Sequence, residues 1–138
     1  MKFQLVKTQA HKFQLQTQGA NESPTNKLQL HSLNVAVRVP EEENNQAFAI
    51  CFTVQASALA EYKIEIECEF WAFFVSDEPL TQEFLESHFA SVNAPAIAYP
   101  YLRSFIALSL VGAGYDAMHL PTINFVERNQ QASTSKPN

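Results

Sequence analysis

Three carboxylates alternate along one segment of the sequence, because Glu65, Glu67 and Glu69 occupy every second position. In an extended chain this spacing places all three on one face of a sheet, about 7 Å apart. Such a row is either a solvated sheet face or a docking surface for a cationic partner. Paired-carboxylate catalysis would need a cleft, and nothing in the sequence marks one. We therefore treat Glu65 and Glu67 as candidates for docking a partner.

The other reactive residue types show no catalytic or metal-binding spacing. Four histidines are spread over the chain: His11, His31, His88 and His119. They lack the i, i+4 spacing of metal ligands, and Cys51 and Cys68 form no CxxC pair. Ser104 and Ser109 lack the glycines of a nucleophile elbow, and Gly112-Ala113-Gly114 lacks the lysine of a phosphate loop. We expect no enzyme, no catalytic residue, no metal site and no cofactor.

Composition limits the classes of partner. The formal net charge of −5 argues against a nucleic-acid backbone or an anionic membrane as the main partner. The sequence starts without an apolar signal core, and its longest apolar runs fall short of the roughly 20 residues of a membrane helix. We expect a cytoplasmic protein. Eleven Phe in 138 residues exceed what one small core absorbs, so some should lie at an interface.

Period-2 patterns predict four strands that position these side chains. They cover residues 11–19, 33–39, 48–54 and 62–74. In the last, an apolar face including Phe70 and Phe74 alternates with a face that begins with glutamates and continues with Trp71 and Phe73. The two sets cannot lie in the same core. Trp71 and Phe73 are therefore candidates for a client-binding surface or a subunit interface. The alternative is that both rings turn into the core at the end of the strand.

The pattern changes to helical spacing after residue 79. A helix is predicted around residues 84–89 and ended by Asn93-Ala94-Pro95, and a second from Pro100, as a first-turn residue, to Val111. Two of the three glycines, Gly112 and Gly114, follow it and predict a left-handed C-cap. Strands followed by helices indicate an α+β fold, an antiparallel four-stranded meander with its helices on one face.

The second predicted helix is apolar nearly all round, as expected of a helix that packs on the sheet and on another subunit. Tyr99, Tyr101 and Phe105 are accordingly further candidates for client or subunit contacts. Residues 1–126 are expected to form one domain. The polar residues 127–138 are expected to be a disordered tail.

Two motifs resemble the SecB protein-export chaperones. Tyr99-Pro100-Tyr101, with Arg103 two residues on, resembles the family's Phe-Pro-Tyr-Ala-Arg stretch before an apolar helix. Leu120-Pro121-Thr122-Ile123-Asn124-Phe125 resembles its Leu-x-Pro-Val-Asn-Phe segment. The resemblance covers roughly residues 33–125. It implies a four-stranded sheet with helices on one face, assembly as a dimer of dimers, and binding of non-native polypeptides and preproteins for the ATPase SecA.

Two departures from the SecB pattern affect the partners. Residues 126–131 soon give way to a polar tail, so the family's C-terminal helix is expected to be short or absent. The chain has neither cysteine nor histidine after His119, so a zinc-binding tail that contacts SecA is not expected. SecB also presents acidic residues on its fourth strand, and Glu65 and Glu67 occupy that part of the pattern.

Three functions are compatible with these patterns. The first is a SecB-like holdase, serving export or a dedicated client such as an antitoxin. The second is a small-ligand-binding or enzymatic α+β domain of the same layout, which would need a closed pocket with convergent polar groups. The third is a purely structural oligomer. The resemblance favours the holdase, as a homotetramer.

Overall fold

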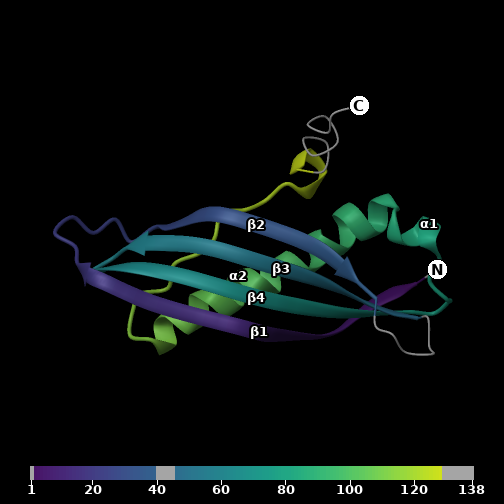
Figure 1. Ribbon diagram of the computed structural model, residues 1–138, viewed down its shortest axis with the longest axis horizontal. Coiled ribbons are helices and arrows are strands. Elements are labelled where there is room, and N and C mark those ends of the chain that lie inside the picture. Colours follow the sequence, from purple (N-terminus) through teal and green to yellow (C-terminus); the bar gives the residue numbers. More distant parts are fainter. Residues whose placement is uncertain (1, 40–45, 129–138) are drawn as a thin grey trace.

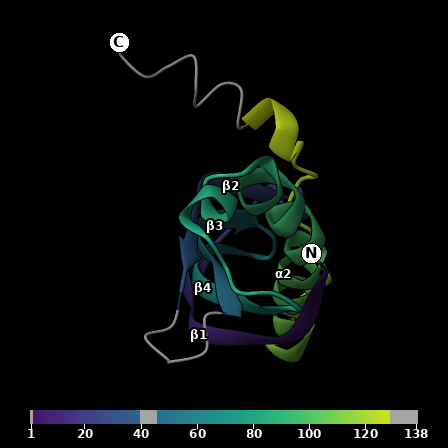
Figure 2. The same ribbon diagram turned by 90° about the vertical axis from the view of Figure 1, so that its right-hand side faces the viewer.

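The computed structural model describes residues 2–39 and 46–128, which form one antiparallel sheet with helices on one face. The strands are β1 (Phe3–Ala20), β2 (Leu28–Arg38), β3 (Ala47–Leu59) and β4 (Tyr62–Ser76). The helical elements are α1 (Gln82–Leu85), η1 (Phe89–Asn93) and α2 (Ala94–Gly112). Figure 2, seen along the strands, shows the sheet and α2 as two layers. The predicted α+β fold is confirmed.

The strand order is β1-β4-β3-β2, so the predicted meander is wrong for the first strand. The strands β2, β3 and β4 follow one another as expected, but β1 lies beside β4 and not beside β2 (Figure 1). The connection predicted at residues 40–45 lies outside the described residues. Because β1 pairs with β4 and not with the strand that follows it, the open face combines residues far apart in sequence.

The first strand is also longer than predicted, with 18 residues instead of the nine expected. Its register against β4 shifts between Leu5 and Lys7, between Ala10 and Lys12, and between Thr17 and Gly19. Each extra residue of such a bulge moves the following side chains to the other face. A strict period-2 pattern therefore finds only the stretch that contains Phe13 and Leu15, and it misses residues 3–10.

The core lies between the sheet and α2. The predicted inward set of β3 is confirmed, because Phe48, Ile50, Phe52 and Val54 are at most 1% exposed. Three residues of α2 cover it, and all are 0% exposed: Leu102, Ile106 and Leu110. Apolar surface removed from water contributes about 25 cal/mol per Å², so this layer dominates the stability of the fold.

The helical part differs from the predicted two helices. The helix does not end at Asn93-Ala94-Pro95, because Pro95 stands in the first turn of α2, where a missing backbone N–H costs nothing. Pro100 is consequently an interior residue and not the start of a helix. The first predicted helix is reduced to the single turn α1, capped by the Thr81 hydroxyl, which accepts a hydrogen bond of 3.0 Å from the Phe84 N–H.

The C-terminus of α2 confirms the predicted glycine cap at Gly114, but not at Gly112. Gly114 has φ 99°, a conformation that L residues with a Cβ rarely adopt. The N–H of Gly114 donates to the Val111 carbonyl and that of Tyr115 to the Leu110 carbonyl, at 3.0 and 2.9 Å. These two bonds define a Schellman motif. The chain then returns along α2 toward β2.

The continuous helical segment Phe89–Gly112 has 24 residues and is long and apolar enough, by length and composition, to cross a membrane. No such segment was expected, because the longest apolar runs of the sequence fall short of the roughly 20 residues of a membrane helix. Its inner side is fully buried against the sheet, and Arg103 in its middle donates a hydrogen bond of 2.8 Å to the Leu120 carbonyl. A buried face of this kind is typical of a core helix in a folded domain.

Candidate binding surfaces

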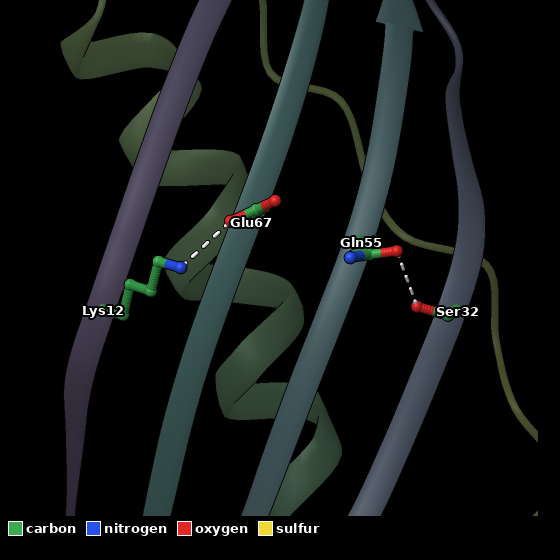
Figure 3. Close-up of polar contacts among 4 residues, drawn as sticks. All are labelled: Lys12, Ser32, Gln55 and Glu67. Atoms are coloured by element: carbon green, nitrogen blue, oxygen red, sulfur yellow. Dashed lines mark hydrogen bonds and ion pairs between the residues drawn. The ribbon is translucent and has the colours of Figure 1, made fainter.

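The open face of the sheet carries the predicted acidic row. Glu65, Glu67 and Glu69 are all exposed on β4, opposite the side that α2 covers. Glu67 is not free, because the Lys12 ammonium of β1 lies 3.0 Å from its carboxylate (Figure 3). This hydrogen bond and the attraction of the Glu67 charge raise the pKa of Lys12. Glu65 forms no ion pair within the described residues, so the acidic row is partly neutralised at its centre.

A shallow hollow of about 310 Å³ joins the acidic row to β3 and β2. Glu65 and Glu67 line one side, and His31, Gln55 and Ser57 line the other. The His31 ring nitrogen lies 2.6 Å from the Ser57 hydroxyl, so both groups are already engaged with each other. Within the described residues no three His, Cys, Asp or Glu side chains are grouped so as to hold a metal ion. The hollow offers hydrogen-bonding groups for a cationic side chain.

An aromatic cluster occupies the other end of the open face. The Trp71 and Phe73 rings are half-buried, with centroids 5.9 Å apart. His11 of β1 stacks on Trp71 at 4.5 Å, and the Lys7 ammonium lies 5.0 Å from the centre of the Phe73 ring. Two residues of β1 thus cover part of rings that β4 presents to solvent. We refer to Lys7, His11, Trp71 and Phe73 as the open-face aromatic cluster.

The other three predicted contact residues lie on the helix side and are not together. Tyr99 is a core residue, 4% exposed, and its hydroxyl donates a hydrogen bond of 2.6 Å to the Pro121 carbonyl. The expectation that Tyr99 lies at a binding surface is therefore wrong for the single chain. Phe105 is half-buried and packs against Phe13 of β1 and Phe70 of β4, each at 5.4 Å. Tyr101 is 51% exposed, as predicted for a contact residue.

Tyr101 belongs to an apolar stripe on the solvent side of α2. The stripe consists of Ile97, Tyr101, Leu108 and Val111, of which Leu108 is 71% exposed. Together with Ser104, which lies between Tyr101 and Leu108, these positions are separated alternately by four and three residues. That spacing is the heptad pattern of helices that pack against each other. The predicted second apolar side of the helix is therefore present. Of its four apolar residues, only Tyr101 was predicted to be a contact residue.

Sequence analysis missed a further apolar groove between the start of α2 and the segment before the C-terminus. It has a volume of about 460 Å³, and Val92, Ala96, Ile123 and Val126 are among its lining residues. Val126 is the second residue of a helical turn, residues 125–128, whose N–H groups at 126 and 127 donate to the Asn124 side chain. Val92 and Ala96 lie on either side of the helix end predicted at Asn93-Ala94-Pro95, and Ile123 and Val126 lie in a segment with no predicted helix or strand. The sequence pattern therefore did not bring these residues together.

The two cysteines lie on opposite faces of the sheet and are both buried. Burial raises the pKa of Cys51 to about 11, and burial together with the Glu69 charge raises the pKa of Cys68 to about 12. Both side chains are thiols at neutral pH, whereas a nucleophilic cysteine needs a thiolate. These residues therefore lack the chemistry of a catalytic cysteine.

Comparison with known protein families identifies the family of this chain. The model of the family described as preprotein translocase subunit SecB matches residues 6–136. The chain belongs to the SecB family. This match confirms the predicted resemblance. Members of this family are chaperones. The family match extends beyond Phe125, where the motif-based resemblance ended.

Two solved structures share the fold of this SecB-family chain. One is the Mycobacterium tuberculosis Rv1957 SecB-like chaperone, solved in complex with a ChAD peptide from the Rv1956 HigA1 antitoxin. The match has a TM-score of 0.67 and 17% sequence identity, and it covers 88% of this chain and 90% of the Rv1957 chain. A Streptococcus agalactiae protein of unknown function has a TM-score of 0.53 and 8% identity over 88% and 98%. No curated protein sequence matches the chain.

Proposed function

We propose that this SecB-family chaperone is a cytosolic holdase that binds non-native polypeptides without chemical turnover. The observation that carries the proposal is the family match over residues 6–136. The surface supports it, because apolar side chains are exposed in three separate places: the open-face aromatic cluster, the stripe on α2 and the groove at the start of α2. Exposed apolar surface that accepts many sequences is what a holdase needs.

We infer that the chain assembles as a homotetramer, a dimer of dimers. The stripe on α2 supports this assembly, because a second copy of the helix would remove Leu108 and Tyr101 from water in a heptad-like contact. An isologous contact between two such helices satisfies both copies at once. Assembly through α2 would leave the open faces of the sheets directed outward and free for partners.

Two kinds of client are compatible with this chain. Residues 129–138 contain no cysteine or histidine, so a zinc-bound contact with SecA would not come from these residues. The structurally similar Rv1957 chaperone binds an antitoxin peptide, so an antitoxin is one such client. If the chain serves export, Glu65 and Glu67 on the open face are the groups that would dock SecA.

Holding activity is tested by the suppression of aggregation of a chemically denatured client. We expect the Trp71→Ser, Phe73→Ser double variant to suppress aggregation less than the wild type, because it loses two aromatic rings from the open face. Its thermal melting temperature should change little, since both rings are half-buried and lie on the side of the sheet away from the core.

Phe70→Ser provides the matched control, because Phe70 stands on the same strand but is 2% exposed in the core. This variant should lower the melting temperature by several degrees, as core truncations do. The proposed role of the open-face rings would be discarded if the double variant melted as early as Phe70→Ser. A wild-type chain that failed to suppress aggregation at a fourfold excess over the client would contradict the holdase proposal itself.

A further inference from the structure

The strand register places two cations at the opposite ends of one row across the sheet. Lys7 pairs with Phe73, Phe73 with Ala49, and Ala49 with Arg38, so these residues of β1, β4, β3 and β2 lie side by side. Arg38 lines a hollow with Trp71 and is therefore on the open face, as Lys7 is. Neighbouring strands are about 4.8 Å apart, so three spacings separate the two cation-bearing positions by about 14 Å.

Both cations are available to a partner. Among the described residues, neither Lys7 nor Arg38 forms an ion pair, whereas Lys12 in the neighbouring part of the face is held by Glu67. The Lys7 ammonium lies over the face of the Phe73 ring, where it keeps most of its donors free. This end of the open face therefore presents positive charge on both sides of an aromatic surface, in contrast to the acidic row farther along β4.

Between the rings of β4 and Arg38 the sheet surface is low and apolar. Ala49 is 1% exposed and Cys51 is 8% exposed, so neither rises above the backbone between the Trp71 ring and Arg38. A hollow of about 160 Å³ lies beside the row, two residues farther along the strands, where Trp71, Cys51 and Ala36 are paired across the sheet. Trp71 forms an aromatic wall of this hollow, and Arg38 lies at its edge. Glu69 also lines it, which disfavours an anion inside the hollow and leaves room for an uncharged side chain.

These dimensions select one chemistry of partner. An extended chain advances about 3.3 Å per residue and points every second side chain to the same side. Four residues therefore span the roughly 14 Å between the cations. We propose that this row docks an extended partner segment with carboxylates at positions i and i+4 and an aromatic residue at i+2, which packs on the Phe73 ring between the two cations. The assignment deepens the proposed function and rests on Trp71 and Phe73 as a partner surface.

Trp71 provides the readout, because it is the only tryptophan in the chain. The probe is the synthetic peptide Gly-Ser-Asp-Ser-Phe-Ser-Asp-Ser-Gly, titrated into the full-length protein while Trp71 fluorescence is recorded. We expect a saturable change. A peptide with both Asp replaced by Asn should bind about tenfold more weakly, because two exposed charge pairs are lost. A peptide with Phe replaced by Gly should also lose most of its affinity.

Charge reversal makes the test specific. The Lys7→Glu, Arg38→Glu variant should lose its affinity for the Asp peptide and should bind a peptide in which Lys replaces both Asp residues. The matched control, Lys27→Glu with Lys63→Glu, makes the same change in net charge at two exposed positions outside the row and should keep the wild-type preference. Equal binding of the Asp and Asn peptides, or no exchange of preference on charge reversal, would overturn the proposal.

Two parallel measurements separate the alternatives. A lower sedimentation mass of the Lys7→Glu, Arg38→Glu variant would identify a second copy of the chain as the occupant and overturn the peptide proposal. Aggregation suppression distinguishes this inference from the proposed function. A holdase that does not bind the peptide overturns the inference alone, whereas a chain that binds the peptide but holds no denatured client overturns the proposed function alone.

Discussion

Individual side chains on β4 have different roles according to the face they occupy. Phe70 and Phe74 are core residues, and Trp71 and Phe73 alternate with them but face solvent on the open side. The partner across the sheet decides how available each exposed group is. Lys12 pairs with Glu67, whereas Glu65 has no such partner among the described residues. Identical residue types in one row therefore differ in what they can bind.

The buried thiols predict a loss of stability at high pH. The pKa of Cys51 is about 11 and that of Cys68 about 12 in the folded chain, against an ordinary value of 9.0. Between these values the unfolded chain loses its thiol protons first, so it binds fewer protons than the folded chain. The free energy of unfolding should therefore be fully retained below pH 9 and fall above it, by up to about 1.4 kcal/mol per pH unit for each thiol.

Urea denaturation at pH 8, 9, 10 and 11 under reducing conditions measures this slope. The Cys51→Ala, Cys68→Ala variant should be less stable at pH 8, because it loses packing, but its stability should fall less steeply between pH 9 and 11. Burial also raises the pKa of Tyr99, to about 12. Both proteins contain Tyr99, so its titration contributes equally to both curves and does not change the difference between them. Parallel curves for the two proteins would contradict the assignment.

At the scale of elements, α2 has two apolar sides with different partners. The inner side packs on the sheet through Leu102, Ile106 and Leu110. The outer stripe, with Ile97, Tyr101, Leu108 and Val111, has no partner within the described chain. The helix remains continuous through Pro100, whose ring is exposed, so the stripe extends over the full length of α2.

Leu108→Lys tests the stripe as a subunit contact. Four copies of a 15.5 kDa chain give about 62 kDa, and light scattering of the wild type on a size-exclusion column should report this mass. A lysine at the most exposed position of the stripe should reduce the mass, because its charge would be buried in the contact. The far-ultraviolet circular dichroism spectrum should stay unchanged.

Leu59→Lys is the matched control, because Leu59 is also an exposed leucine, 43%, but lies at the end of β3 away from the helix. It should leave the mass at that of the wild type. A wild-type chain that is monomeric at micromolar concentration would contradict the tetramer. A Leu108→Lys variant with the full wild-type mass would place the contact elsewhere.

At the scale of the whole molecule, helix-side and sheet-side surfaces point in opposite directions (Figure 2). Assembly through α2 and docking on the open face can therefore occur together. The C-terminal segment belongs to neither surface. Its last described residue, Arg128, donates a hydrogen bond to the Leu33 carbonyl of β2, which is an edge strand.

This arrangement predicts which part of the chain contacts SecA if the protein serves export. Glu65→Lys with Glu67→Lys should abolish binding without dissociating the oligomer, because the carboxylates lie on a rigid strand and the second lysine would also repel Lys12. Removal of residues 129–138, which keeps the Arg128 contact, should leave the affinity within about twofold, because it removes only one cation, Lys136.

Titration calorimetry at two salt concentrations provides the measurement. Exposed charge pairs weaken as the screening length shortens from about 10 Å at 0.1 M to about 3 Å at 1 M salt, so wild-type binding should fall with salt. The opposite ranking of the two variants would discard docking on the open face. Absence of binding in every variant would favour a dedicated client over export.

The sequence by itself determined the features that depend on local alternation. Period-2 patterns predicted β2, β3 and β4 and most of the residues that β3 and β4 bury, although Tyr62 at the start of β4 is exposed. The same alternation placed Trp71, Phe73 and the glutamates on the opposite face. These predictions succeeded because side chains of a strand alternate between faces wherever the strand lies in the sheet. The family motifs around Tyr99 and Leu120 were equally local, and the family is confirmed.

Tertiary structure alone decided which strands and side chains meet. Bulges break the alternation of β1, so its first half and its place beside β4 depend on pairing over some 60 residues of sequence. The two prolines suggested helix boundaries that packing on the sheet overrides. The row from Lys7 to Arg38 and the pairing of Lys12 with Glu67 also join distant strands, and hydrophobic pattern specifies which face a residue occupies but not its neighbour across the sheet.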